Sequence, residues 1–244
     1  MSAAFKLISI NIEGNKHLPR IRAFLEAEKP GIVCLQELSE ESIPFFEELL
    51  GASCVFAPMT SVQNTNGKRV IGVGIFSRLA VQESTVEYYV DHLTPEVNFD
   101  KSSFETKFAT ASFAVAAVTV LVDTVPFTVL STHFPVTDGG EATDFQREAL
   151  ASLLSTLEKY DSFVLCGDFN APRGREIFSS LASRYIDNVP SQYTSSLDPD
   201  LHRAAPLELM VDGLFTTVDI AAENVSMRCG VSDHCALVAT VTKR

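Results

Sequence analysis

A series of short apolar runs, each bounded by polar or turn-forming residues, most constrains how this chain can fold. Val, Ile, Phe and Thr are frequent in these runs, and the runs are too short for most helices, so they predict β-strands. The runs are residues 5–12, 32–35, 70–76, 110–122, 127–132, 163–166, 209–216 and 235–241.

Three segments between these runs repeat apolar residues at helical spacing: residues 18–28, 40–50 and 142–157. They predict amphipathic helices. Strands and helices alternate early in the chain, whereas residues 70–132 are almost entirely strand-like. We therefore expect an α/β protein in which two mixed sheets pack face to face with helices outside. No Gly-, Ser- or Pro-rich linker divides the sequence, so we expect a single domain over residues 1–244.

Composition narrows the class of protein. The 244 residues are 46% hydrophobic, which favours a packed domain over a disordered chain. A net charge of −12 argues against a passive nucleic-acid coat protein. The longest uncharged apolar stretch, residues 108–122, is shorter than the roughly 20 residues of a membrane span, so we expect no membrane insertion.

The cysteines and the start of the chain bear on its compartment. The five cysteines are an odd number and form no CxxC pair, so we expect them to be reduced packing residues in a cytoplasmic protein. No basic start precedes the first apolar run, and no signal peptide is expected.

Polar residues follow the ends of several predicted strands, where the loops of a rigid scaffold converge on functional sites. Asn11 and Glu13 close the first run, and Glu37 closes a fully apolar second run. A buried glutamate is costly unless it is paired or binds a metal, so Glu37 requires a partner. Similar groups close or interrupt later runs: His133, Asp168, Asn170, Asp212, Asp233 and His234.

Seven short motifs carry a resemblance over nearly the whole chain: Asn11, Gln36-Glu37, residues 72–78 (GVGIFSR), Thr132-His133-Phe134, residues 167–170 (GDFN), Val211-Asp212 and Ser232-Asp233-His234. In this order the set resembles the endonuclease/exonuclease/phosphatase superfamily, which includes DNase I, exonuclease III, inositol polyphosphate 5-phosphatases and neutral sphingomyelinases. The resemblance implies a four-layered αββα sandwich with two packed mixed sheets, and hydrolysis of a phosphate ester.

The resemblance also implies catalytic roles. Asp168 would orient or deprotonate the attacking water, and Asn170 would help to hold that water and a phosphate oxygen. His234 would donate to the phosphoryl group in the transition state, with Asp212 orienting its ring. His133 would be a second donor to the phosphate, at a position where the abasic-site endonuclease branch carries Tyr, which argues against an abasic-site endonuclease.

The same residues suggest a metal. Oxygen ligands such as Glu37, Asp233 and the Asn11 amide suit Mg²⁺ or Mn²⁺, which would act as a Lewis acid. With five histidines and no CxxC pair, a structural zinc site is disfavoured. For Glu13 two readings stay open, contact with the metal through water or simple solvation.

Purely structural readings compete with these roles. Asn11 and the 167–170 segment are typical of turns, and Asp212 is suited to begin a turn at Gly213. Glu37 is alternatively an ordinary acidic residue at the N-terminus of the following helix. His133 is also compatible with a packing or surface position.

Substrate choice is expected to depend on three inserts, residues 58–69, 88–107 and 191–206. Candidate substrate contacts are Arg147, Arg173 and Asn66, and His202 and Arg203 lie in the third insert. A surface salt bridge is an equal alternative for Arg147.

We expect a monomeric, divalent-metal-dependent phosphodiesterase acting on nucleic acid, DNA or RNA, or on a nucleotide-linked ester. The alternative is an enzyme for a small or lipid-derived phosphate, such as an inositol phosphate or sphingomyelin. The absence of a long hydrophobic insert counts against the lipid version. A catalytically inactive binding module is a third reading, although no motif residue is lost.

Overall fold

The computed structural model describes residues 3–64, 67–91, 96–97, 111–203 and 207–244. Its helices are α1 (Leu18–Glu28), α2 (Ile43–Leu50), α4 (Asp144–Leu157) and α5 (Glu176–Ala182), with 3-10 turns at Glu40–Ser42 and Asp138–Gly140. Its strands are β1 (Ala4–Asn11), β2 (Ile32–Ser39), β3 (Cys54–Asn64), β4 (Gly67–Ser77), β5 (Ala80–Val90), β6 (Glu96–Val97), β7 (Phe113–Val122), β8 (Val125–His133), β9 (Val164–Asp168), β10 (Ile186–Asp187), β11 (Asp212–Thr216), β12 (Ile220–Arg228) and β13 (Ala236–Lys243).

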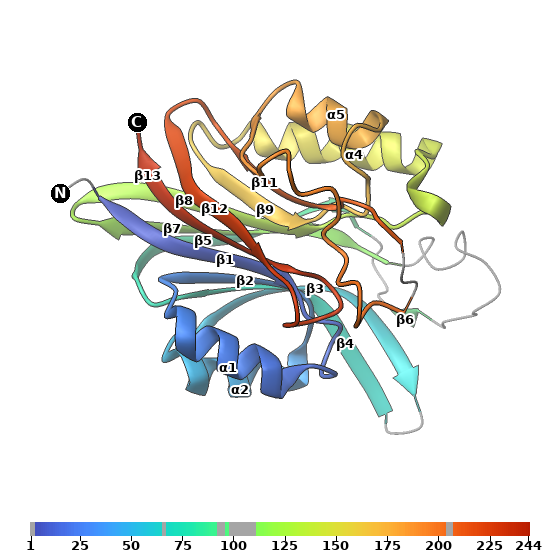
Figure 1. Cartoon of the computed structure of the whole chain (residues 1–244), viewed down its shortest axis with the longest axis horizontal. Coiled ribbons are helices and arrows are strands. Elements are labelled where there is room, and N and C mark those ends of the chain that lie inside the picture. Colours follow the sequence, from blue (N-terminus) through green and yellow to red (C-terminus); the bar gives the residue numbers. More distant parts are fainter. Residues whose placement is uncertain (1–2, 65–66, 92–95, 98–110, 204–206) are drawn as a thin grey trace.

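The strands form two mixed sheets. Over the described ranges, the first sheet has the order β12-β13-β1-β2-β4-β3-β6 and the second β10-β11-β9-β8-β7-β5. The β1–β2 and β8–β9 pairs are parallel, and most other neighbours are antiparallel. Helices α1 and α2 cover the outer face of the first sheet, and α4 and α5 lie on the opposite side of the molecule (Figure 1). The expected αββα sandwich is confirmed.

Alternation along the strands builds the core on both faces of the first sheet. In β1, Leu7 belongs to the apolar cluster between the sheets, whereas Ile8 belongs to the cluster beneath the helices. Successive side chains of a strand point to opposite faces, so one apolar strand serves both clusters. Ile21 and Leu25 of α1 and Phe46 of α2 complete the outer cluster.

Strands β3, β5 and β12 were not predicted from the sequence, nor was helix α5. Strand β5 is the edge of its sheet, and most of its residues are exposed or half-buried, so its sequence reads as polar. The expectation that residues 58–69 form a loop-like insert is wrong, because much of this segment belongs to β3 and β4. Among the described residues, no helix combines the length and apolar character that crossing a bilayer requires.

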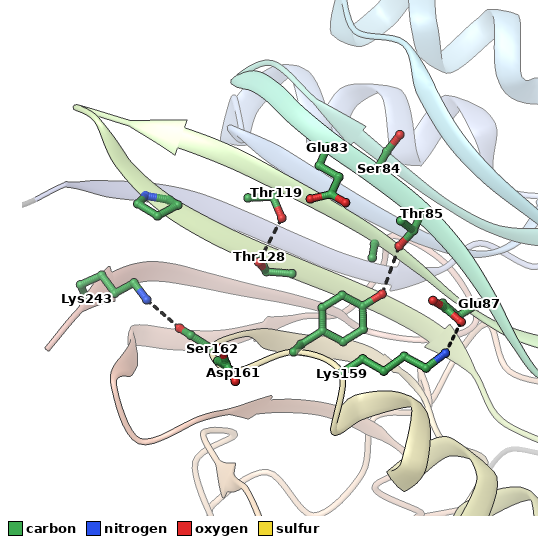
Figure 2. Close-up of a pocket in the computed structure, with 13 residues that line it drawn as sticks. Glu83, Ser84, Thr85, Glu87, Thr119, Thr128, Lys159, Asp161, Ser162 and Lys243 are labelled. Atoms are coloured by element: carbon green, nitrogen blue, oxygen red, sulfur yellow. Dashed lines mark hydrogen bonds and ion pairs between the residues drawn. The ribbon is translucent and has the colours of Figure 1, made fainter.

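A cavity of about 450 Å³ lies where β8 and β9 begin (Figure 2). Its lysines are paired: Lys159 Nζ donates to Glu87 Oε2 at 2.6 Å, and Lys243 Nζ donates to Ser162 Oγ at 2.6 Å and to Asp219 Oδ2 at 2.8 Å. These pairs neutralise the lysine charges locally. The cavity therefore offers little net attraction for a phosphate.

Candidate active site

The polar residues that follow the predicted strand ends meet at the other end of the sandwich. The β8–β9 register places His133 opposite Asp168, and the β9–β11 register places Asp212 opposite Asp168. Strand β13 runs antiparallel to β1, so the residues before β13 lie beside the end of β1. A cavity of about 300 Å³ at this end is lined by Glu13, Glu37, His133, Asp168, Asn170, His202, Arg203, Asp233 and His234, among others.

Asp168 is the centre of this arrangement. Its Oδ2 accepts a hydrogen bond from Asn11 Nδ2 at 3.1 Å and lies 3.5 Å from His133 Nε2 and 3.8 Å from His234 Nε2. Its Oδ1 accepts the backbone N–H of Asn170 at 2.8 Å. The residue is only 1% exposed, so these contacts hold the carboxylate in one orientation.

Two features of the backbone place the Asp168 segment. Gly167 approaches β8 so closely that a Cβ atom there would lie 1.9 Å from the carbonyl oxygen of Thr132, which excludes larger residues. Asn170 has a φ of 48°, in the left-handed region that asparagine tolerates better than most residues. Its Nδ2 consequently lies 2.9 Å from His133 Nε2 and donates to the Phe134 carbonyl at 2.9 Å.

His234 and Asp212 form a buried pair, with 2.8 Å between His234 Nδ1 and Asp212 Oδ2. Burial by itself lowers the pKa of His234, but the charges of Asp212 and Asp168 outweigh it and raise the pKa to about 10. The ring is therefore a cation near neutral pH. With Nδ1 held by Asp212, Nε2 faces the Asp168 side and can donate to a bound anion.

Carboxylates also gather on the other wall of the cavity. Burial raises the pKa of Asp233 to about 6; His234 opposes this shift, and the charges of Glu13 and Glu37 add to it. Donor atoms of Glu13, His17 and Asp233 lie within 4.8 Å of one another. Glu37 and Asp233, which both line this cavity, offer hard oxygen donors that suit a divalent cation such as Mg²⁺ or Mn²⁺.

Glu37 reaches this wall because β2 is irregular at its end. The β2–β4 register shifts between Leu35 and Leu38, and Glu37 has a φ of 54°. Such a bulge re-aims a side chain that regular alternation would place elsewhere. Asn11 Nδ2 donates to Glu37 Oε1 at 3.2 Å, while Asn11 Oδ1 accepts the Glu13 N–H at 3.1 Å. In this geometry Asn11 holds two carboxylates in place and directs its oxygen at the backbone.

Glu13 has its own partners, Lys16 and His17. Burial raises the pKa of Glu13, but hydrogen bonds from Lys16 and His17 outweigh it, and the net shift is downward. Its Oε2 lies 3.1 Å from His17 Nε2. Glu13 is therefore an ion-paired residue at the cavity wall, close to Asp233.

The structure does not bring Arg147 or Arg173 to this cavity. Arg147 Nε donates to Glu176 Oε1 at 2.7 Å and Nη1 to Asp144 Oδ1 at 2.7 Å, in line with the surface salt-bridge alternative. Arg173 pairs with Asp187 at 3.0 Å. Both guanidinium groups are thus engaged with carboxylates away from the cavity lining.

His202 and Arg203 of the third insert do line the cavity, whereas Asn66 lies outside the described residues. Asp198 shapes this loop, because its Oδ1 accepts the N–H groups of Asp200 and Leu201 at 2.9 Å each. The ring centroid of His202 is 5.9 Å from that of His234. Burial lowers the pKa of His202, and the charges of His234 and Arg203 add to this shift, so Arg203 is the cation that this insert contributes. The sequence pointed to the insert but did not rank Arg203 above Arg147 and Arg173.

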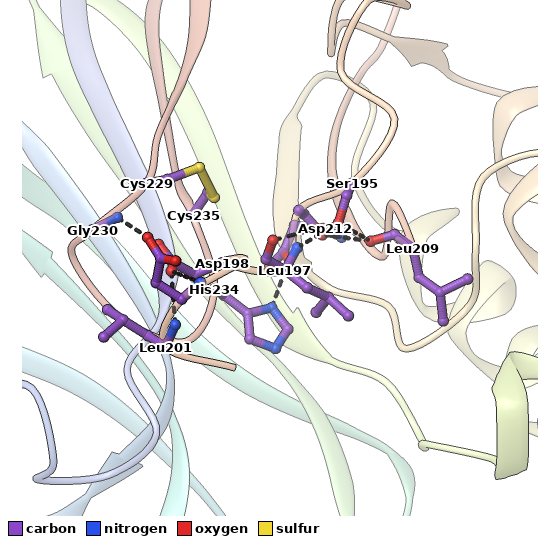
Figure 3. Close-up of a disulfide and its surroundings, with 12 residues drawn as sticks. Ser195, Leu197, Asp198, Leu201, Leu209, Asp212, Cys229, Gly230, His234 and Cys235 are labelled. Carbon is purple, nitrogen blue, oxygen red and sulfur yellow. Dashed lines mark hydrogen bonds and ion pairs between the residues drawn. A yellow bond between two sulfur atoms is a disulfide. The ribbon is translucent and has the colours of Figure 1, made fainter. Parts of the chain in front are cut away.

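A disulfide between Cys229 and Cys235 joins the two ends of the connection that carries Asp233 and His234 (Figure 3). The expectation that all five cysteines are reduced is therefore wrong for this pair. Cys34, Cys54 and Cys166 are free thiols. The sequence signal for this pairing is that two cysteines six positions apart flank the Ser-Asp-His motif. The cross-link shortens the range over which His234 can move.

Solved structures share this fold. The human Nocturnin catalytic domain with bound sulfate has a TM-score of 0.74 and 18% identity, covering 99% of this chain and 94% of that one. ANGEL2, described as a 2′,3′-cyclic phosphatase, has a TM-score of 0.71 and 16% identity, covering 98% and 95%. A Bacteroides thetaiotaomicron VPI-5482 mannosyl-6-phosphatase has a TM-score of 0.69 and 12% identity, covering 97% and 99%. At these identities the likeness shows the fold alone.

Comparison with curated protein sequences found no match. The family model described as the endonuclease/exonuclease/phosphatase family matches residues 8–234, which include every residue of the site from Asn11 to His234. The resemblance noted in the sequence is confirmed. The members of this family are phosphoesterases. The chain belongs to the endonuclease/exonuclease/phosphatase family.

Proposed function

We propose that this protein is a divalent-metal-dependent phosphodiesterase acting on nucleic acid or on a nucleotide-linked ester. The observation that carries the proposal is the group of donors around Asp168: Asn11, His133 and His234 approach one carboxylate, which lines the cavity together with the two histidines. Such a group positions a water and neutralises phosphoryl oxygens, the two main tasks in phosphate ester hydrolysis.

In this proposal Asp168 orients the attacking water and accepts its proton. His133 and Asn170, whose side-chain nitrogens lie 2.9 Å apart, donate to phosphate oxygens. The His234 imidazolium donates through Nε2 to the charge that develops on the phosphoryl group, and Asp212 keeps Nδ1 occupied. The His234 donor is in place before the substrate binds, which avoids reorganisation there, whereas His133 and Asn170 exchange their mutual contact for bonds to the phosphate.

Glu37 and Asp233 would hold the Mg²⁺ or Mn²⁺, with Glu13 nearby. When bound, such an ion supplies Lewis-acid charge to the phosphate. Asn11 would keep Glu37 and Asp168 oriented through its amide nitrogen. Burial is the first cause of the raised pKa of Asp233, and a cation bound there would favour the charged form of this carboxylate.

A phosphatase for a small phosphate ester is the second candidate. It is favoured by the shared fold of the mannosyl-6-phosphatase, and ANGEL2 offers a third ester class, 2′,3′-cyclic phosphates. An inactive binding module is disfavoured, because the residues expected for catalysis are all present in the cavity or directly behind it.

The test is hydrolysis by purified protein with Mg²⁺, Mn²⁺ or EDTA. Substrates are single- and double-stranded DNA, RNA, 5′-tyrosyl-DNA, bis-p-nitrophenyl phosphate, 2′,3′-cyclic nucleotides, sugar phosphates and inositol phosphates. We expect metal-dependent turnover of at least one diester, and a loss of about 10²-fold or more in Asp168→Ala. Turnover that is indifferent to both EDTA and this substitution would refute the mechanism. Binding without turnover of any ester would favour the inactive module.

Two further points concern the oligomeric state and the compartment. We expect a monomer, which sedimentation tests. The cytoplasmic location expected from the sequence conflicts with the Cys229–Cys235 disulfide, because cytosolic reductants keep most protein thiols reduced. Alkylation of the protein in its native cells, with and without reductant, distinguishes a cytosolic from an oxidising compartment.

A further inference from the structure

A second cavity of about 300 Å³ adjoins the catalytic one. The two cavities share five lining residues: Glu37, His133, Val136, Asn170 and Arg203. His133 and Asn170 are the donors assigned above to the phosphate oxygens. A phosphate bound to them therefore lies at the junction, and the group esterified to it can enter the second cavity.

The walls of this second cavity differ in chemistry from those of the catalytic cavity. Beyond the shared residues, the described lining is mostly apolar: Met59, Ile71, Gly72, Ala111, Phe113 and Phe134, with Thr60 and Ser112 as the polar members. A mostly apolar pocket with a few polar groups is the usual composition of a site for a small organic group.

The aromatic part of the wall is held rigidly. Tyr89 is buried, and its ring centroid lies 6.2 Å from that of Phe134 and 6.4 Å from that of Phe113. The Tyr89 hydroxyl lies 3.1 Å from Thr132 Oγ1, next to His133. The wall is consequently built before any ligand binds, which lowers the entropic cost of binding.

The opposite wall comes from β3 and β4. The β3–β4 register shifts between Pro58 and Thr60, so the consecutive residues Met59 and Thr60 both line the cavity, which strict alternation does not allow. Gly72 contributes only backbone there, and a larger residue is excluded because its Cβ atom would lie 1.9 Å from the Ala57 carbonyl oxygen.

Thr60 supplies the observation that points to a ligand. Its Oγ1 is buried, and over the described part of the chain it has no hydrogen-bond partner. A buried hydroxyl without a partner is costly, so a group that bonds to it gains affinity. A lipid tail or a plain aliphatic group offers no such partner, whereas the edge of a nucleobase carries both donors and acceptors.

We propose that this second cavity is a nucleobase subsite, in which the base of a nucleotide packs between the Phe113–Phe134 wall and Ile71 and bonds to Thr60. This inference rests on the proposed function for the position of the phosphate, and it narrows the substrate class to nucleotide esters. Arg203, which lines both cavities, lies where it can bridge the base subsite and the phosphate.

The test uses binding, which does not depend on turnover. Isothermal titration calorimetry gives the dissociation constants of the four nucleoside 5′-monophosphates, of ribose 5-phosphate and of n-hexyl phosphate. Each ligand is titrated into the metal-free and the Mg²⁺-loaded protein. We expect at least one nucleotide to bind about tenfold or more tightly than ribose 5-phosphate, since packing one base is worth that much or more. Thr60→Val and Ile71→Phe should each reduce this preference at least about threefold. Thr128→Val, the same change at a residue that lines the cavity of about 450 Å³ described above, should leave the preference unchanged.

Thermal unfolding of each variant establishes that it is folded before binding is compared. Equal binding of nucleotides and ribose 5-phosphate would overturn the subsite, as would a preference that survives both substitutions. n-Hexyl phosphate binding as tightly as the nucleotides would assign the cavity to aliphatic groups and also overturn it. A nucleotide preference in a protein that hydrolyses no ester would refute the proposed function and leave the subsite standing.

Discussion

Replacement of Asp212 by Asn tests how the fold prepares His234 for catalysis. The substitution keeps an oxygen that can accept from His234 Nδ1, now 2.8 Å from the carboxylate, but removes the charge. The pKa of His234 lies at about 10 against an ordinary value of 6.5, although burial alone would lower it. A neighbouring carboxylate favours the protonated form of a histidine and raises its pKa by about 1–3, so we expect the pKa of His234 in Asp212→Asn to fall to about 7–9.

The sign of the effect follows from which form is active. A raised pKa keeps the imidazolium present at every pH below it, so a lower pKa moves the loss of the donor to lower pH. Near pH 6 the ring stays protonated in both proteins, and we expect kcat/KM to fall about tenfold or less. Near pH 9 the variant has lost between about half of the cation, for a pKa of about 9, and nearly all of it, for a pKa of about 7, so we expect a larger loss than at pH 6, up to about 10²-fold.

The assay is kcat/KM across this pH range with saturating Mg²⁺, on whichever diester is turned over. Histidine NMR of the metal-free protein reports the titration of His234 directly. Asp219→Asn is the matched control, because Asp219 is also paired with a cation, Lys243, but at the other end of the molecule. A ratio of wild-type to Asp212→Asn activity that is constant with pH would refute the reasoning, as would an unchanged His234 titration.

Three further predictions concern stability. Gly167→Ala should destabilise the protein by about 3 kcal/mol, measured by urea unfolding, because its Cβ would meet backbone at 1.9 Å. Reduction of Cys229–Cys235, which closes a loop across a sequence separation of 6, should cost about 2 kcal/mol and lower the Tm; an unchanged Tm would contradict this. Burial raises the pKa of Asp219, but hydrogen bonds from Lys243, Ser162 and Thr217 outweigh it, and the net shift is downward. The contribution of Asp219 to the stability of the folded protein is therefore present above the ordinary pKa of 3.8 and lost as pH falls further. Asp219→Asn should therefore cost about 0.5–1 kcal/mol near pH 7 and progressively less in acid, whereas exposed Asp161→Asn should cost little at either pH.

Much of the fold could be predicted because buried strands and helices have characteristic spacings of apolar residues in the sequence. The helix expected at residues 18–28 is α1, and the apolar runs at 32–35 and 163–166 begin or form β2 and β9. Strands β5 and β12 were missed for the opposite reason: each is an edge strand with an exposed or half-buried face, so its sequence alternates weakly.

The candidate site was readable where a polar residue interrupts an apolar run at a strand end. The sequence by itself determined that Asp168 and His234 would stand at such ends and that Glu37 would interrupt an apolar run, because a charged group beside buried residues needs a partner and is rarely placed there without one. It also determined the order of the motifs, and with it the family.

Only the tertiary structure decided which of these groups touch. Asn11 and Asp168 are 157 positions apart and lie 3.1 Å from each other, because the end of β1 in one sheet packs over the end of β9 in the other. The structure also selected Arg203 over Arg147 as a cavity residue, and it joined Cys229 to Cys235. Distances across two packed sheets depend on strand order and on bulges, and neither leaves a periodic trace in the sequence.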